Sequence, residues 1–84
     1  MDPGWDRFAA LCREEFVDCG FQAELVRACG GNEDIAWAVH FHCRGDALGW
    51  MRRPFRALNG NVPAQLIEAG RGDEVRECLW SMPC

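Results

Sequence analysis

The sequence has no long hydrophobic segment, although 49% of its 84 residues are hydrophobic. A membrane-spanning helix needs a run of roughly 18 or more uncharged apolar residues, and no such run occurs. The opening residues, Met1-Asp2-Pro3-Gly4, also lack the basic and apolar regions of a secretory signal. We therefore expect a soluble protein in the cytoplasm that has no membrane partner.

Lysine is absent: all nine basic residues are arginine, and thirteen Asp and Glu residues bring the net charge to -4. Proteins that bind nucleic acid usually carry a basic stripe that neutralises phosphates. The one basic group, Arg52, Arg53 and Arg56, has spacings that place it on one helical face, and a solvated face is its simplest interpretation. We expect no direct contact with nucleic acid, and we retain these arginines as candidate partner contacts.

The sequence also lacks the patterns of catalytic and cofactor sites. It contains no Gly-rich phosphate loop, no Cys-x-x-Cys and no helical His-x-x-x-His pair. The cluster His40-x-His42-Cys43 supplies too few ligands for a tetrahedral zinc site. A domain this small has little room for a substrate pocket of about 300 Å³ or more. We expect no enzyme, no catalytic residue, no bound metal and no cofactor.

The chain contains six cysteines, namely Cys12, Cys19, Cys29, Cys43, Cys78 and Cys84. An even number of cysteines in a small chain is typical of a disulfide framework, but the cytoplasm keeps thiols reduced. Four of them recur at apolar helical positions, where a thiol packs as a small hydrophobic group. We therefore expect thiols in a hydrophobic core rather than disulfides.

Apolar residues recur at intervals of three and four along the chain, which indicates helices. Helical segments are expected at 3–19, 21–29, 33–44, 47–51, 63–69 and 73–81, with one or two turns at 54–58. Asp2, Asn32 and Asp46 are the expected N-caps, and Gly20 and Gly45 the expected ends of the first and third helices. The predicted fold is all-α: one domain, 1–84, forming a compact bundle of five to six short helices, with N-terminal helices in 1–45 followed by 46–84.

The first helix shows the clearest apolar stripe, formed by Trp5, Phe8, Cys12, Phe16 and Cys19 and widened by Leu11. The third helix differs because it is apolar nearly all round, so most of its surface must be covered. Two interpretations stay open: a protein interface that involves Trp37 or Phe41, or a central helix of the core.

The final helix carries a second candidate contact. Trp80 points away from the apolar side of that helix, which comprises Val75, Cys78, Leu79 and Met82. Tryptophan is enriched in binding hot spots. We therefore take Trp80 as the candidate exposed anchor, with Met82 as a neighbouring partner contact.

The second half of the chain carries an ordered set of short-helix boundaries. They are Ala47-Leu48-Gly49-Trp50-Met51-Arg52-Arg53-Pro54, then Ala57-Leu58-Asn59-Gly60-Asn61-Val62-Pro63-Ala64-Gln65-Leu66-Ile67, then Gly70 and Gly72-Asp73-Glu74-Val75. The prolines and glycines fix the helix lengths so that six apolar side chains converge in a small core. Those six are Trp50, Leu58, Leu66, Ile67, Val75 and Leu79.

In order and spacing, this segment resembles the toxin-binding domain of the Xre/MbcA/ParS antitoxin family, over roughly residues 46–82. The resemblance implies binding and neutralisation of a RES-type toxin, an enzyme that acts on NAD. The chain departs from the family at Val62, where a hydroxyl N-cap worth about 1 kcal/mol is usual. Its first 45 residues also lack the helix-turn-helix that many members carry, so we expect no autoregulation by this chain alone.

Three hypotheses follow. In the first, the chain is an antitoxin-like module that binds and inhibits a toxin enzyme. A homodimer of the chain is one form that this module could take. In the second, it is a small inhibitor from a mobile element, such as an anti-CRISPR protein, that binds a bacterial defence complex. In the third, which is less favoured, it is a thiol or zinc protein.

Overall fold

A computed structural model describes residues 3–82 of the chain. Within this range the chain forms helices and no β-strand, which confirms the all-α fold class. The helices are α1 Pro3–Phe16, α2 Gln22–Ala28, α3 Glu33–Cys43, α4 Ala47–Arg52, α5 Pro63–Glu68 and α6 Gly72–Ser81, with 3₁₀ turns η1 Arg44–Asp46 and η2 Arg56–Leu58. None of these helices is long and apolar enough to cross a membrane.

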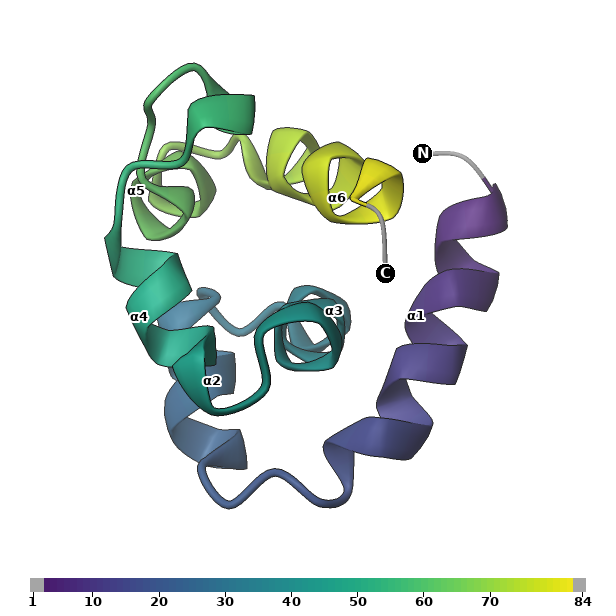
Figure 1. The fold of residues 1–84 in the computed structure, drawn as a ribbon. Coiled ribbons are helices and arrows are strands. Elements are labelled where there is room, and N and C mark those ends of the chain that lie inside the picture. Colours follow the sequence, from purple (N-terminus) through teal and green to yellow (C-terminus); the bar gives the residue numbers. More distant parts are fainter. Residues whose placement is uncertain (1–2, 83–84) are drawn as a thin grey trace.

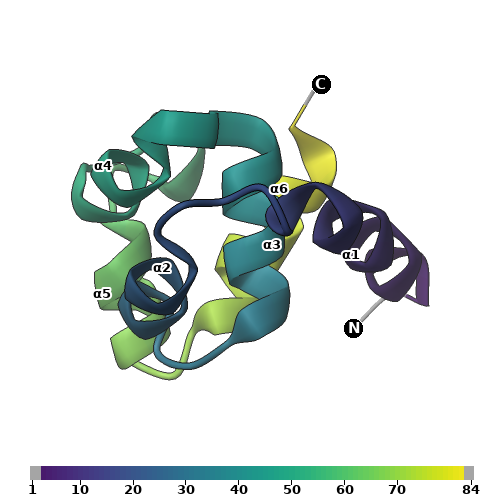
Figure 2. The ribbon, with the colours of Figure 1, turned by 90° about the horizontal axis from the view of Figure 1, so that it is seen from below.

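The third helix is the centre of the bundle. Figure 1 looks almost along α3, with α1 on one side, α2, α4 and α5 on the other, and α6 across the remaining side. The view from below shows the same arrangement around α3 (Figure 2). Ile35, Ala36, Ala38 and Val39 of this helix have no exposed surface. The interpretation as a central core helix is therefore confirmed for most of α3.

The small core expected for the second half is also present. Trp50, Leu58, Leu66, Val75 and Leu79 are buried, and the half-buried Ile67 packs against them. Pro54 ends α4 because Arg53 before it is extended, and Pro63 begins α5. Val62 precedes α5 without a side-chain capping bond, as its apolar side chain requires.

Within residues 3–82 the cysteines form no disulfide bond with one another. Cys12, Cys19, Cys29 and Cys78 are buried, and Cys43 is half-buried, so the expectation of core thiols is confirmed for these positions. Burial, followed by the nearby charge of Asp34, raises the pKa of Cys29 to about 12. Such a thiol packs as a hydrophobic group and is a poor nucleophile. Cys84 lies outside the described residues.

One helix end was predicted wrongly, and a second differs from the prediction by one residue. α1 ends at Phe16 rather than near Gly20, because the side-chain amide of Gln22 donates a hydrogen bond to the carbonyl of Phe16 at 3.1 Å. α3 ends at Cys43, where Arg44 rather than Gly45 adopts the positive φ, at 49°. The Arg44 guanidinium lies 5.6 Å from the centre of the Phe41 ring, a contact that helps to hold this conformation.

The predicted capping bonds are also absent. Asn32 precedes α3 and Asp46 precedes α4, but neither side chain bonds to the backbone of the helix that follows. The Asn32 side-chain oxygen instead accepts a hydrogen bond from Arg76 at 3.1 Å, and the Asp46 carboxylate accepts one from Arg53 at 2.6 Å. A partner elsewhere therefore displaced the capping interaction in both cases. Asp2, the third predicted cap, lies outside the described residues.

Leu11 was predicted to widen the buried stripe of α1 and is instead 62% exposed. At about 100° per residue, Leu11 is turned away from its neighbour Cys12 toward the outer side of the helix. Trp5, Cys12, Phe16 and Cys19 are buried as expected, and Phe8 is half-buried.

The loop after α2 approaches α5 very closely. Gly30 has a φ of 64°, and a Cβ atom at this position would lie 2.9 Å from Cγ2 of Ile67. Both the backbone conformation and the lack of space require glycine here. This contact joins the N-terminal half of the fold to the segment that follows Gly45.

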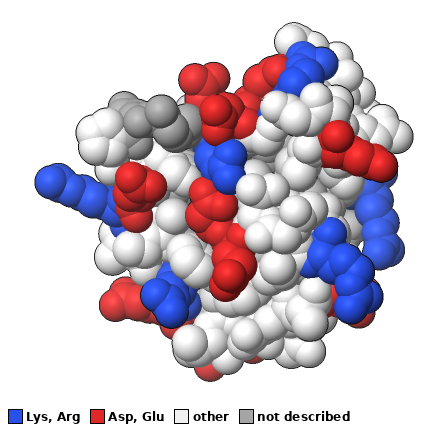
Figure 3. Space-filling model, turned by 180° about the vertical axis from the view of Figure 1, so that it is seen from behind, with Lys and Arg blue, Asp and Glu red and all other residues white. Residues whose placement is uncertain are grey.

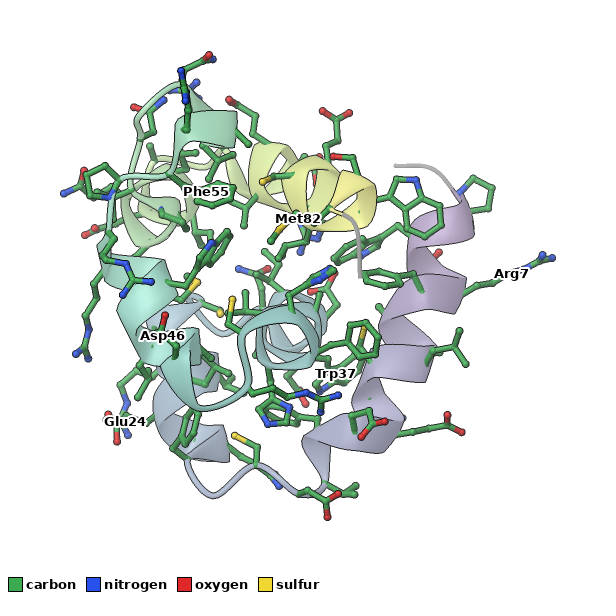
Figure 4. All side chains as sticks on the ribbon, viewed as in Figure 1. Arg7, Glu24, Trp37, Asp46, Phe55 and Met82 are labelled. Carbon is green, nitrogen blue, oxygen red and sulfur yellow. The ribbon has the colours of Figure 1, made fainter. Side chains whose placement is uncertain are left out.

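One ion pair connects the first, third and last helices. Arg76 on α6 contacts both carboxylate oxygens of Asp34 on α3, with Nε to Oδ2 at 2.8 Å and Nη2 to Oδ1 at 3.2 Å. The indole of Trp5 on α1 donates to the same Oδ2 at 3.0 Å. Arg76 also donates to Asn32 at 3.1 Å and to Asp73 at 2.9 Å. Figure 4 shows the side chains of the molecule on the ribbon.

The network around Asp34 lowers the pKa of its carboxyl group. Burial raises the pKa of the carboxyl, but the hydrogen bonds from Arg76 and Trp5 and the charge of Arg76 more than offset burial and leave it below the ordinary value. A lowered carboxyl pKa stabilises the folded state above the unfolded value of about 3.9. That contribution is lost as the pH falls through the lowered pKa of the folded state.

His40 is buried but, unlike Asp34, it has no oppositely charged group bound to it among the described residues. It is 6% exposed and its ring packs edge-on against Phe16 and Phe21, at 5.8 and 6.3 Å between centres. Its Nδ1 atom has no hydrogen-bond partner within residues 3–82. Burial and then the charge of Arg44 lower the pKa of His40, while Asp18 and Glu15 act in the opposite direction. The folded chain therefore favours neutral His40.

The first prediction concerns the Asp34–Arg76 pair. Asp34→Asn should lower the free energy of unfolding by about 1–3 kcal/mol, because it leaves a largely buried guanidinium with only the exposed carboxylate of Asp73 as a charged partner. Urea unfolding measures this change. The matched control is Asp46→Asn, in a pair whose side chains are 57% and 61% exposed. We expect the control to leave the free energy of unfolding nearly unchanged; equal losses would contradict a special role for Asp34.

The second prediction concerns pH. Unfolded histidine binds a proton with a pKa of about 6.5, whereas folded His40 binds it only at lower pH. The stability that neutral His40 contributes is therefore complete above about pH 6.5 and decreases as the pH falls toward the folded pKa. Urea unfolding across this range should show the decrease, and His40→Leu should flatten it. Equal slopes in both proteins would show that folding does not perturb His40.

Candidate protein-binding surface

Aromatic side chains from three helices meet around Phe8. The ring of Phe8, on α1, lies 5.7 Å from Phe41 and 5.7 Å from His42, both on α3, and 5.4 Å from Trp80 on α6. Phe41 and His42 are also 5.5 Å apart. We call Phe8, Phe41, His42 and Trp80 the aromatic cluster. Its rings meet at tilted and edge-to-face angles, an arrangement that aromatic quadrupoles favour.

The aromatic cluster is only partly covered. Trp80 is 42% exposed, and Phe8, Phe41 and His42 are half-buried. In the described part of the chain, the only other exposed large hydrophobic residues are Leu11 and Val17. A partner that covers these rings therefore buries apolar area already held in place by ring contacts, which reduces the entropy cost of binding.

A hydrogen bond fixes the position of α6 in this cluster. Nε2 of His42 lies 2.9 Å from the carbonyl oxygen of Leu79, the residue before Trp80. Because a carbonyl only accepts, Nε2 of His42 carries the proton and donates it. The carbonyls in the last turn of a helix have no partner within the helix. His42 therefore satisfies one of them and holds the turn that presents Trp80.

The structure brings together two of the seven residues predicted to contact a partner, Phe41 and Trp80. Met82 directly follows α6 and packs half-buried against the core (Figure 4). Trp37 lies one turn before Phe41 on α3, where the guanidinium of Arg13 is 5.3 Å from its ring centre. Trp37 is thus engaged by α1, and it has no ring contact with the cluster among the described residues.

The prediction that three arginines share a helical face is wrong. Arg52 ends α4, Arg53 is extended before Pro54, and Arg56 begins η2, so no single helix contains them. All three are exposed, and Arg53 is paired with Asp46. On the face shown in Figure 3, basic side chains lie mostly toward the edges and acidic ones gather near the middle. The arginines are therefore no part of the aromatic cluster.

Sequence reasoning missed Phe8 and His42 as members of this surface. Phe8 was assigned to the buried stripe of α1, and its half-burial follows from its position at the edge of that stripe. His42 was treated as part of a possible metal cluster. Neither residue carries a local sequence signal for its role, because the partners of each lie on other helices.

The described residues show no alternative site with metal chemistry. Within residues 3–82, no group of three or more His, Cys, Asp or Glu side chains is arranged to hold a metal ion. One surface hollow, of about 410 Å³, lies between α2 and α5, and Arg27, Ile67 and Glu68 are among the residues that line it.

Comparison with known proteins finds one family. Residues 44–82 match the model described as the antitoxin Xre/MbcA/ParS C-terminal toxin-binding domain. The match begins at η1 and includes α4, α5 and α6, which is less than half of the 84 residues. It confirms the resemblance seen in the sequence. No curated protein and no solved structure gives a significant match.

The aromatic cluster crosses the boundary of the matched segment. Trp80 lies inside residues 44–82, whereas Phe8, Phe41 and His42 lie before it. The N-terminal helices thus supply most of the rings that surround the exposed tryptophan of the matched segment.

The third prediction tests the central contact of the cluster. In a double-mutant cycle of Phe8→Ala and Trp80→Ala, the two losses of stability should be non-additive by about 0.5–1.5 kcal/mol, because either substitution removes the shared edge-to-face contact. Urea unfolding of the four proteins gives this coupling. The control cycle pairs Trp80→Ala with Val17→Ala, an exposed position outside the cluster, and should be additive. Additivity in both cycles would contradict the contact.

Proposed function

We propose that this protein is an antitoxin-like binding module that inhibits a RES-type toxin, an NAD-consuming enzyme, by covering part of its surface. The match of residues 44–82 to a toxin-binding domain carries this proposal. In it, the partner is a protein, and the chain itself performs no chemistry. The chain neither spans a membrane nor contacts nucleic acid, and it acts in the cytoplasm, where thiols stay reduced.

The aromatic cluster supplies the contact surface in this proposal. Binding energy at protein interfaces concentrates in a few residues, and tryptophan is prominent among them. Trp80 combines 42% exposure with contacts that fix its ring, from Phe8 directly and from His42 through Leu79. An anchor held in this way loses little side-chain freedom when a partner covers it. Phe41 and Met82 extend the apolar surface next to it.

The arginines have a secondary role in this proposal. Arg52, Arg53 and Arg56 are exposed near the boundary between α4 and η2, inside the matched segment. Exposed charges of this kind alter the association rate and the choice of partner more than the final affinity. We therefore expect their removal to make binding slower and less dependent on salt, with a smaller loss of affinity than removal of Trp80.

The fourth prediction tests the proposal directly. When the chain is produced with a RES-type toxin from the genome that encodes it, the two proteins should co-purify and the NAD content of the cells should be preserved. Trp80→Ala should weaken the complex by about tenfold or more, equivalent to about 1.4 kcal/mol, as expected for a hot-spot residue. Titration calorimetry with the purified toxin measures this loss.

Val17→Ala is the control, because Val17 is exposed and follows the C-terminal end of α1, more than two helical turns beyond Phe8. It should bind the toxin with wild-type affinity. The proposal fails if NAD is consumed equally with and without the chain and no complex forms. Recovery of a bacterial defence complex, instead of a toxin, by the tagged chain would favour the second hypothesis, an inhibitor carried by a mobile element.

A further inference from the structure

The outward side of α1 has no partner in the described fold. α1 lies at the edge of the molecule with one side against α3, and no other element covers its far side (Figure 1). Arg7, Ala10, Leu11 and Glu14 are all exposed there. We call these four residues the α1 outer face. Leu11 is 62% exposed, against 42% for Trp80, so this apolar side chain is more open to solvent than the proposed anchor.

Two opposite charges flank the apolar centre of this face. Arg7 and Glu14 lie on the same side of the helix, two turns apart, at a separation along the axis of about 10 Å. That distance is too long for them to pair with each other within one helix. Neither makes a salt bridge to another residue of the described range. The face thus presents one positive end, a leucine and alanine centre, and one negative end.

The charges of the α1 outer face are complementary to those of a second copy that runs antiparallel to it. In an antiparallel pair of α1 helices with two-fold symmetry about the Ala10–Leu11 position, Arg7 of each copy lies opposite Glu14 of the other. The same register brings the two Leu11 side chains together at the symmetry axis. A parallel pair would instead place like charges opposite one another. Charge and apolar pattern therefore select the same arrangement.

We propose that a second copy of this chain docks on the α1 outer face, forming an antiparallel homodimer. This surface lies outside residues 44–82 and on the side of α1 turned away from α3, so the inference is independent of toxin binding. A contact of one short helix face per copy belongs to the small class of interfaces, below about 1,200 Å². The dimer should accordingly be weak, dissociating at micromolar or higher concentrations. The two ion pairs determine its orientation and the Leu11 contact excludes water.

The fifth prediction is measured by sedimentation velocity of the full chain, with a reductant present so that the thiols do not cross-link. Between about 10 µM and 1 mM, the range in which weak interfaces assemble, the average mass should rise from 9.5 kDa toward the dimer value. Arg7→Glu and Glu14→Arg should each weaken the dimer by about tenfold or more, because each places like charges opposite one another. Leu11→Arg should abolish it.

The double variant, Arg7→Glu with Glu14→Arg, restores both pairs with their signs exchanged and should return the dissociation constant to within about threefold of the original. Arg27→Glu, which reverses an exposed arginine on α2, is the matched control and should have no effect. All of these positions are exposed, and far-UV circular dichroism verifies that the variants fold. A chain that stays monomeric at 1 mM, or a double variant as weak as the single ones, would overturn the proposal. So would an equal effect of Arg27→Glu.

Discussion

The contact between Arg76 and Asp34 determines how the rest of the bundle is assembled. α6 is the last helix of the chain and α3 precedes it by some thirty residues, yet both oxygens of Asp34 bind Arg76. Trp5 adds α1 to the same carboxylate, so three helices are oriented by one side chain. Hydrophobic packing alone is not directional and would allow α6 to slide or rotate. The two-point ion pair fixes its register, and with it the position of Trp80.

The central helix completes the core of the matched segment. Residues 44–82 form five short elements, η1, α4, η2, α5 and α6, which together bury only a small core. Below about 40 residues a chain rarely buries enough surface to fold without help. Ile35 and Val39 of α3 are completely buried and belong to the same core as Val75 and Leu79. The N-terminal half thus completes the core and also supplies three of the four rings that make up the aromatic cluster.

Much of the fold could be predicted from local rules. The spacing of apolar residues located every helix, and the glycine and proline positions located the boundaries in the second half. Two of the errors share one cause. Gln22 terminates α1 before Gly20, and Arg53 removes Asp46 from its capping role, because a side chain from another part of the chain supplied a better partner. Local sequence patterns do not contain such partners.

The candidate surface was less predictable than the fold for the same reason. Trp80 was identified because its position on the helix directs it away from the apolar side, a property of one helix alone. Phe8 and His42 acquire their roles only from contacts with α3 and α6, which depend on how the helices pack. The three arginines looked like one group because their spacings, taken alone, fit one face of a helix. The break at Pro54 separates them into three different backbone environments.

The close approach of Gly30 to Ile67 restricts which residues can stand at position 30 in related sequences. Residue 30 lies before the segment that the family model matches, and residue 67 lies within it. Any substitution at position 30 would push α2 away from α5, whereas Ile67 tolerates other branched or shorter side chains. A glycine at this site, two residues before an Asn-acid-acid helix start, is therefore a mark by which distant relatives of the N-terminal half can be recognised, even when their remaining residues have diverged.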